Sequence, residues 1–78
     1  MTAADALQWI ERLFELQEST INAETTREEI DAWDSLGVLT LMAGLNEDFG
    51  IEMTDSELQS LKSVKDILIL LENRGLLN

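Results

Sequence analysis

The residues in this 78-residue sequence that point to chemistry lie in one short segment, Asp34-Ser35-Leu36. The chain has no cysteine and no histidine, which excludes disulfides, thiolate catalysis, a Ser-His-Asp triad and imidazole ligands for a metal. Aspartate followed by serine is also typical of an ordinary helix start, because both residues cap helices well. The tripeptide therefore marks either a simple cap or a serine hydroxyl presented at the end of a helix.

Sixteen acidic residues against five basic ones give the chain a net charge of −11. This charge disfavours nucleic acid and membranes as partners and favours proteins with basic patches. Asp31, Asp34 and Gly37 lack the ligand spacing of a calcium loop, so we expect no metal site. The N-terminus is not a secretory signal, and the longest apolar run, Ile67 to Leu71, is too short to span a bilayer. We expect a monomeric, cytoplasmic protein with a single domain over residues 1–78.

Helical periodicity dominates the sequence and predicts an all-α fold. We expect a first helix from about Ala3 to Gln17, with a capping box at Thr2 and with Trp9 beside its apolar stripe and partly exposed. We expect a second helix from about Ser35 to Asp48, capped by Asp34.

The rest of the chain predicts one long loop, one short helix and one further longer helix. Residues 18–33 show no period and form the loop, which we expect to be anchored by Ile21, Ile30 and Trp33. A capping box at Thr54 starts the short helix, a second box-like segment starts at Ser63, and Gly75 ends the last helix.

This order of features resembles the acyl carrier proteins. Their prosthetic-group helix and its exit look like two stretches of this chain, WDSL at residues 33–36 and LMAGLNEDFGI at residues 41–51. The resemblance covers nearly the whole chain and is strongest from Asp31 to Met53. It implies a four-helix bundle of acyl-carrier type and a protein that carries groups for enzymes without being an enzyme.

The resemblance also implies how Ser35 is used. A phosphopantetheinyl transferase would move 4′-phosphopantetheine from coenzyme A onto the Ser35 hydroxyl, and the arm's thiol would carry acyl groups as thioesters in fatty-acid, lipid or related biosynthesis. Asp34 would cap the helix and help the transferase to recognise the site. A phosphodiester at Ser35 would meet free backbone amides and the positive end of the helix dipole.

The second helix is apolar over more than half of its circumference, which is broader than packing on one side requires. We expect an acyl pocket lined by Leu39, Met42, Leu45, Phe49, Ile67, Leu68 and Leu71. We expect acyl-loading and acyl-accepting enzymes to contact an exposed Leu36 together with Gly37, Thr40, Ala43, Gly44, Glu47 and Asp48. Typical family members have acidic residues where this chain has Gly37 and Thr40, which predicts a specialised carrier instead of the housekeeping one.

Two alternatives remain open from the sequence. A stand-alone aminoacyl or peptidyl carrier would share the fold, Ser35 and the arm, but an adenylating enzyme would load it with an amino acid. An acidic helical adaptor would have no prosthetic group, and its Asp34-Ser35 pair would serve only as a helix cap.

Overall fold

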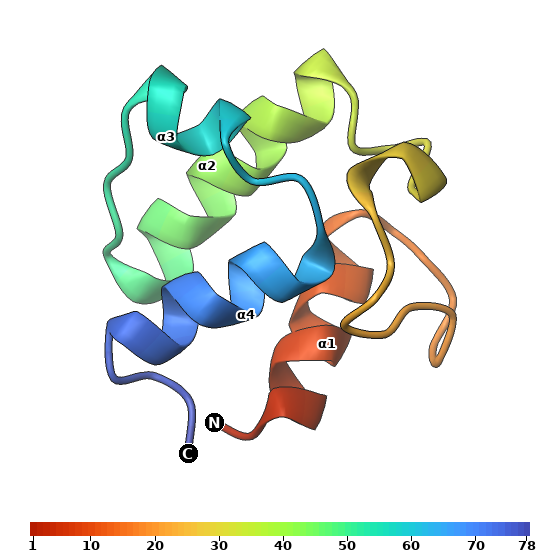
Figure 1. The fold of residues 1–78 in the computed structure, drawn as a ribbon, viewed down its shortest axis with the longest axis horizontal. Coiled ribbons are helices and arrows are strands. Elements are labelled where there is room, and N and C mark those ends of the chain that lie inside the picture. Colours follow the sequence, from red (N-terminus) through yellow and green to blue (C-terminus); the bar gives the residue numbers. More distant parts are fainter.

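The computed structural model describes all of residues 1–78, and its regular elements are all helices, with one isolated backbone bridge, between Thr26 and Ser63. Its elements in chain order are α1 (Ala3–Leu13), η1 (Arg27–Glu29), α2 (Ser35–Phe49), α3 (Asp55–Gln59) and α4 (Val64–Asn73). The two termini lie side by side (Figure 1), where the backbone N–H of Asn78 donates to the Met1 carbonyl at 2.9 Å. The expected fold of three longer helices and one short helix is confirmed.

Local sequence signals set most of the helix ends. Reciprocal capping boxes start α1 at Thr2 and α3 at Thr54, as expected. Ser63 caps α4, but the carboxylate of Asp66 accepts from the Lys62 N–H instead of completing a box. Gly75 follows α4 with a φ of 73°, in the left-handed region that glycine adopts without strain. No helix has both the length and the apolar composition that a membrane span requires.

The first helix ends four residues before the expected Gln17, at Leu13. The chain turns at Glu15, whose φ is 57°, and the N–H of Leu16 returns to the carbonyl of Glu11 at 2.7 Å. The Glu11 side chain is buried, and its carboxylate accepts from the backbone N–H of Thr20 at 3.0 Å. This contact holds the following loop close to α1.

Trp9 is buried, so the expectation of partial exposure was wrong. Its indole N–H donates to the carboxylate of Asp48 on α2 at 2.6 Å, and its ring centroid lies 4.9 Å from that of Phe49. A buried indole needs such an acceptor for its N–H group, and α2 supplies it. The pair joins the middle of α1 to the C-terminal end of α2.

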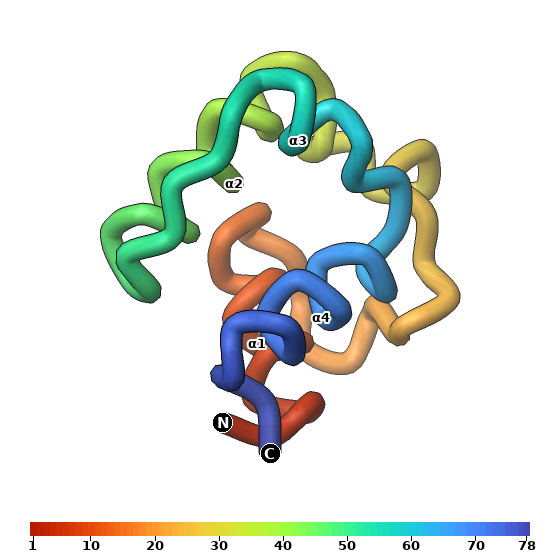
Figure 2. Tube along the Cα trace, turned by 60° about the vertical axis from the view of Figure 1, so that its left-hand side comes forward, coloured from red at the N-terminus to blue at the C-terminus, as the bar shows by residue number.

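The long loop between α1 and α2 is fixed to the α3–α4 junction (Figure 2). Three backbone hydrogen bonds join Ala23, Thr25 and Arg27 on the loop to residues 62–65, at 2.8–3.1 Å. The expected anchors Ile30 and Trp33 are buried, and Ile21 is half-buried. The loop is therefore packed against the helices along its length, and it leads into the start of α2.

Candidate functional site

The start of α2 is capped by Asp34, as expected. Its Oδ1 atom accepts the backbone N–H of Gly37 at 2.9 Å, and its carbonyl accepts the N–H of Val38 at 2.9 Å. Ser35 is the first helical residue and is exposed. Neither its hydroxyl nor the backbone N–H groups of Ser35 and Leu36 have a hydrogen-bond partner within the protein. The site therefore presents one free hydroxyl and two free backbone donors at a helix N-terminus.

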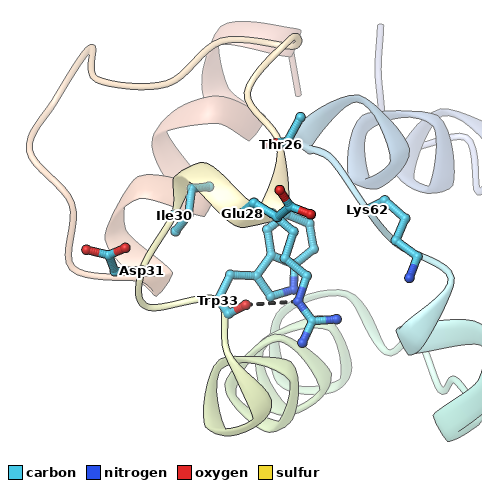
Figure 3. A pocket seen from close by; sticks show the side chains of 7 residues that line it. Thr26, Glu28, Ile30, Asp31, Trp33 and Lys62 are labelled. Atoms are coloured by element: carbon cyan, nitrogen blue, oxygen red, sulfur yellow. Dashed lines mark hydrogen bonds between the residues drawn. The ribbon is translucent and has the colours of Figure 1, made fainter.

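The residue before the cap is firmly held. Trp33 is buried, and its ring stacks on Phe14, the residue that follows α1, with centroids 5.7 Å apart. The Trp33 N–H donates to the Ile30 carbonyl at 2.9 Å. The carbonyl of Trp33 accepts from Nε of Arg27 at 2.9 Å, which is the dashed line in Figure 3. Ser35 is thus exposed on a rigid turn.

Gly37 and Gly44 are buried, so the prediction that they contact partner enzymes was wrong. A Cβ on Gly37 would lie 2.0 Å from the backbone oxygen of Ala32, so the loop occupies the space of a side chain. A Cβ on Gly44 would lie 2.6 Å from Leu13 Cδ1. Both glycines permit close approach, but by segments of their own chain.

The other residues expected to face partners lie on the outside of α2. Leu36 is 73% exposed, which confirms the expectation of an open side chain beside Ser35. Thr40, Ala43 and Glu47 are also exposed. Asp48 is exposed too, but its carboxylate already binds the indole of Trp9, so it has a structural role.

The residues expected to line an acyl pocket belong to the core or pack against it, with the exception of Leu39. Leu45, Ile67 and Leu71 are fully buried core residues, whereas Leu39 is 52% exposed and does not belong to the interior. Met42, Phe49 and Leu68 are half-buried against the core. Of the seven, Met42 lines an open groove of about 380 Å³, formed by Met42, Ala43, Asn46, Glu47, Ile51, Glu52 and Met53.

A second cavity, of about 600 Å³, lies beside the turn that precedes Ser35 (Figure 3). It is lined by Thr26, Arg27, Glu28, Ile30, Asp31, Trp33 and Lys62. Sequence reasoning did not assign Arg27 or Lys62 to the site, because each is an isolated basic residue without a motif. At the edge of the same region, a backbone hydrogen bond from Thr26 lowers the pKa of Glu29.

Comparisons with known proteins agree with this arrangement. The family model described as the phosphopantetheine attachment site matches residues 4–71. The chain is 35% identical over 69 residues to an acyl carrier protein homolog of Mycoplasmopsis pulmonis, covering 87% of this chain and 93% of that protein. It is 50% identical over 40 residues to an acyl carrier protein of Campylobacter hominis, and this match covers 51% of each chain.

A solved structure extends the likeness to the fold. The solution structure of holo acyl carrier protein from Geobacter metallireducens matches with a TM-score of 0.75 and 34% identity, covering 94% of this chain and 85% of that one. These matches do not favour the aminoacyl carrier or the adaptor without a prosthetic group. This chain belongs to the acyl carrier protein family, whose members hold acyl groups on a 4′-phosphopantetheine arm.

Proposed function

We propose that the Ser35 hydroxyl accepts 4′-phosphopantetheine from coenzyme A and that the chain then shuttles acyl thioesters between biosynthetic enzymes. The free, exposed hydroxyl at the first position of α2 is the observation that carries this proposal. Thr2 and Ser63 also have hydroxyls at helix starts, but they are N-cap residues, the position that Asp34 occupies at α2, and their hydroxyls accept hydrogen bonds from their own helices. When bound, the prosthetic group supplies the thiol that this cysteine-free chain lacks.

The start of α2 suits a phosphodiester on Ser35. The backbone N–H groups of Ser35 and Leu36 are free to donate to an anion, and the positive end of the helix dipole favours negative charge there. The first turn of α2 contains no acidic residue that would compete for these donors. In this proposal the chain holds and orients the phosphodiester and serves its partner enzymes as a carrier.

Asp34 has two separable roles in this proposal. Its Oδ1 atom caps the helix, and no hydrogen bond engages its Oδ2 atom, which is free to bind the metal ion of the transferase. Asp34→Asn should keep the cap, because asparagine caps as well as aspartate, and should change stability by less than about 0.5 kcal/mol. We expect modification to slow about tenfold or more because the carboxylate charge is lost. A normal modification rate would leave Asp34 with only the capping role.

The exposed outer face of α2 is the surface that we assign to partner enzymes. It consists of Leu36, Leu39, Thr40 and Ala43, and carries no charge until Glu47. A partner would therefore meet an apolar surface beside Ser35, while its basic patches would pair with acidic residues further along the chain. The uncharged face beside Ser35 favours a specialised carrier. We propose that this carrier acts as a monomer with cytoplasmic biosynthetic enzymes. The net charge of −11 opposes self-association.

The groove at Met42 is the place that we propose for an apolar cargo. Leu36, Leu39 and Met42 follow one another at three-residue intervals and lead from Ser35 to the groove. Met53 on the far side adds a second flexible apolar side chain. A long acyl chain would extend this groove only by displacing core residues such as Leu45 and Leu71.

Intact mass spectrometry after incubation with coenzyme A and a broad-specificity phosphopantetheinyl transferase tests the proposed function. We expect the parent to gain one phosphopantetheine and Ser35→Ala to gain none. Ser56→Ala is the matched control, because Ser56 is also an exposed serine in the first turn of a helix. No gain in the folded parent, or loss of modification in Ser56→Ala, would overturn the assignment.

A further inference from the structure

Arg27 connects three parts of the fold at the turn before Ser35. Its backbone N–H donates to the Lys62 carbonyl at 2.8 Å, which ties it to the α3–α4 junction. Its guanidinium donates through Nε to the Trp33 carbonyl at 2.9 Å and through Nη1 to Oε1 of Gln59, on α3, at 3.2 Å. Both acceptors of the side chain are uncharged, so Arg27 acts here as a directed pair of donors more than as a counter-ion.

The Trp33 carbonyl depends on this contact. Trp33 is buried, and no backbone N–H donates to its carbonyl oxygen, because the helical hydrogen bonds of α2 begin at the carbonyl of Asp34. A carbonyl on a buried residue needs a partner, and a hydrogen bond from a charged donor is stronger than a neutral one. Arg27 thereby fixes the peptide that leads directly into the Asp34 cap and Ser35.

We propose that Arg27 is a positioning residue for the modification of Ser35: it holds the turn before α2 in the orientation that the transferase must recognise. The inference rests on the proposed attachment at Ser35. Bonds to the α3–α4 junction fix the backbone at Arg27, and the side chain passes this constraint to the Trp33 carbonyl. Loss of the side chain would leave Ser35 present but less well oriented, which is costly for a reaction that depends on placement.

The positioning role of Arg27 can be separated from an effect of net charge, because the two predict opposite changes in the rate of modification when the charge of Arg27 is removed. Arg27→Gln makes an already acidic chain more acidic, which would favour binding to a transferase with a basic surface. Positioning predicts that the same substitution slows modification. Arg74→Gln removes the same charge at an exposed position just after α4, and is the matched control for charge.

The test measures kcat and KM of a phosphopantetheinyl transferase separately for each variant of the full chain. We expect Arg27→Gln to lower kcat/KM about tenfold, and Gln59→Ala, which removes only one of the two acceptors, to lower it less. Arg74→Gln should react like the parent. Thr2→Ala removes the capping box of α1, which shares no hydrogen bond with Arg27, and controls for a general loss of stability, so it should also react like the parent.

Amide hydrogen exchange gives a readout that needs no transferase. We expect Arg27→Gln to speed exchange at the Gly37 amide, which bonds the Asp34 carboxylate, while the amide of Leu71 in the core of α4 stays as protected as in the parent. Parent-like kcat/KM and parent-like exchange in Arg27→Gln would overturn the inference, as would equal slowing in Arg74→Gln or Thr2→Ala. If the parent itself is never modified, the proposed function fails, and exchange at Gly37 alone decides whether Arg27 orders the turn.

Discussion

The starts of α2 and α3 contrast two ways of finishing a helix N-terminus. At α3, the Thr54 hydroxyl accepts from the Glu57 N–H at 3.2 Å, and the Glu57 carboxylate accepts from the Thr54 N–H at 2.9 Å. Asp55 and Glu57 also place negative charge in that first turn. At α2, Asp34 caps a single N–H group, and the first turn contains no acidic residue.

This difference supports the proposed attachment of an anionic phosphodiester at the start of α2. The chain's own carboxylates complement the first turns of α1, α3 and α4, through Asp5, Glu57 and Asp66 respectively. At α2 the chain's own carboxylate is on the N-cap residue Asp34, and none lies within the first turn, where the exposed Ser35 hydroxyl lies. A phosphodiester on Ser35 would add negative charge within this first turn, where the other three helices carry a carboxylate of their own.

The largest expected effect comes from closing the space in the first turn of α2. Gly37→Ala places a Cβ 2.0 Å from the Ala32 oxygen, so backbone must move, and we expect a loss of about 3 kcal/mol in chemical denaturation. Gly44→Ala is the control, since its nearest neighbour is the mobile end of the Leu13 side chain. A gain of about 1 kcal/mol in Gly37→Ala, as helix propensity alone predicts, would contradict the geometry.

Attachment of the prosthetic group should itself stabilise the fold. We expect the holo-protein to be more stable than the apo-protein by about 0.5–1 kcal/mol, because the phosphodiester meets free amides at the start of α2. In a domain of this size that corresponds to a rise in Tm of roughly 2–8 °C. The rise should shrink in about 1 M salt, which screens the interaction. A lower Tm for the holo-protein would mean that repulsion in this acidic chain outweighs the favourable site.

A carboxylate added to the first turn of α2 should stabilise that helix as the acidic residues do in the first turns of α1, α3 and α4. Leu36 is exposed in the first turn, so Leu36→Glu should stabilise the apo-protein by about 0.5 kcal/mol through the helix dipole. The same carboxylate should slow modification because it competes for the free donors. Leu39→Glu makes the same charge change on an exposed residue outside the first turn and should give no such gain. Equal melting curves for the two variants would argue against an open anion site.

The smallest expected effect is the pH dependence of the stability that Glu57 contributes at the start of α3. The backbone hydrogen bond from Thr54 is the main cause that lowers the pKa of Glu57 from its ordinary value of 4.5. A lowered folded-state pKa means that the contribution is fully present above about pH 4.5 and is lost as the pH falls through the lower folded value. The Tm of the parent should therefore be higher than that of Glu57→Gln at pH 7, and this difference in Tm should disappear in acid. An advantage that grows on acidification would contradict this sign.

Features encoded over a few neighbouring residues could be predicted from the sequence. The caps at Thr2, Asp34 and Thr54, the stop at Gly75 and the exposure of Leu36 all depend on local patterns, and the structure confirms them. The family resemblance rested on the order of such features along nearly the whole chain and was strongest from Asp31 to Met53. Attachment at Ser35 remains a prediction.

Features set by contacts between distant segments could not be predicted. The end of α1 depends on the Glu11 carboxylate reaching the amide of Thr20, and the burial of Trp9 depends on Asp48. The sequence predicted that partner enzymes contact Gly37 and Gly44, but it could not show that the long loop and α1 cover these two glycines. The contact between Arg27 and Trp33 likewise has no sequence signature, because an isolated arginine in a loop does not indicate its acceptor.

The most direct test of the central claim is to locate the prosthetic group within the holo-protein. Trypsin releases the peptide from Glu28 to Lys62, which contains Ser35, Ser56 and Ser60. Fragmentation of this peptide by tandem mass spectrometry should place the whole phosphopantetheine mass on Ser35. The same mass on Ser56, on Ser60 or outside the peptide would contradict the assignment of α2 as the prosthetic-group helix.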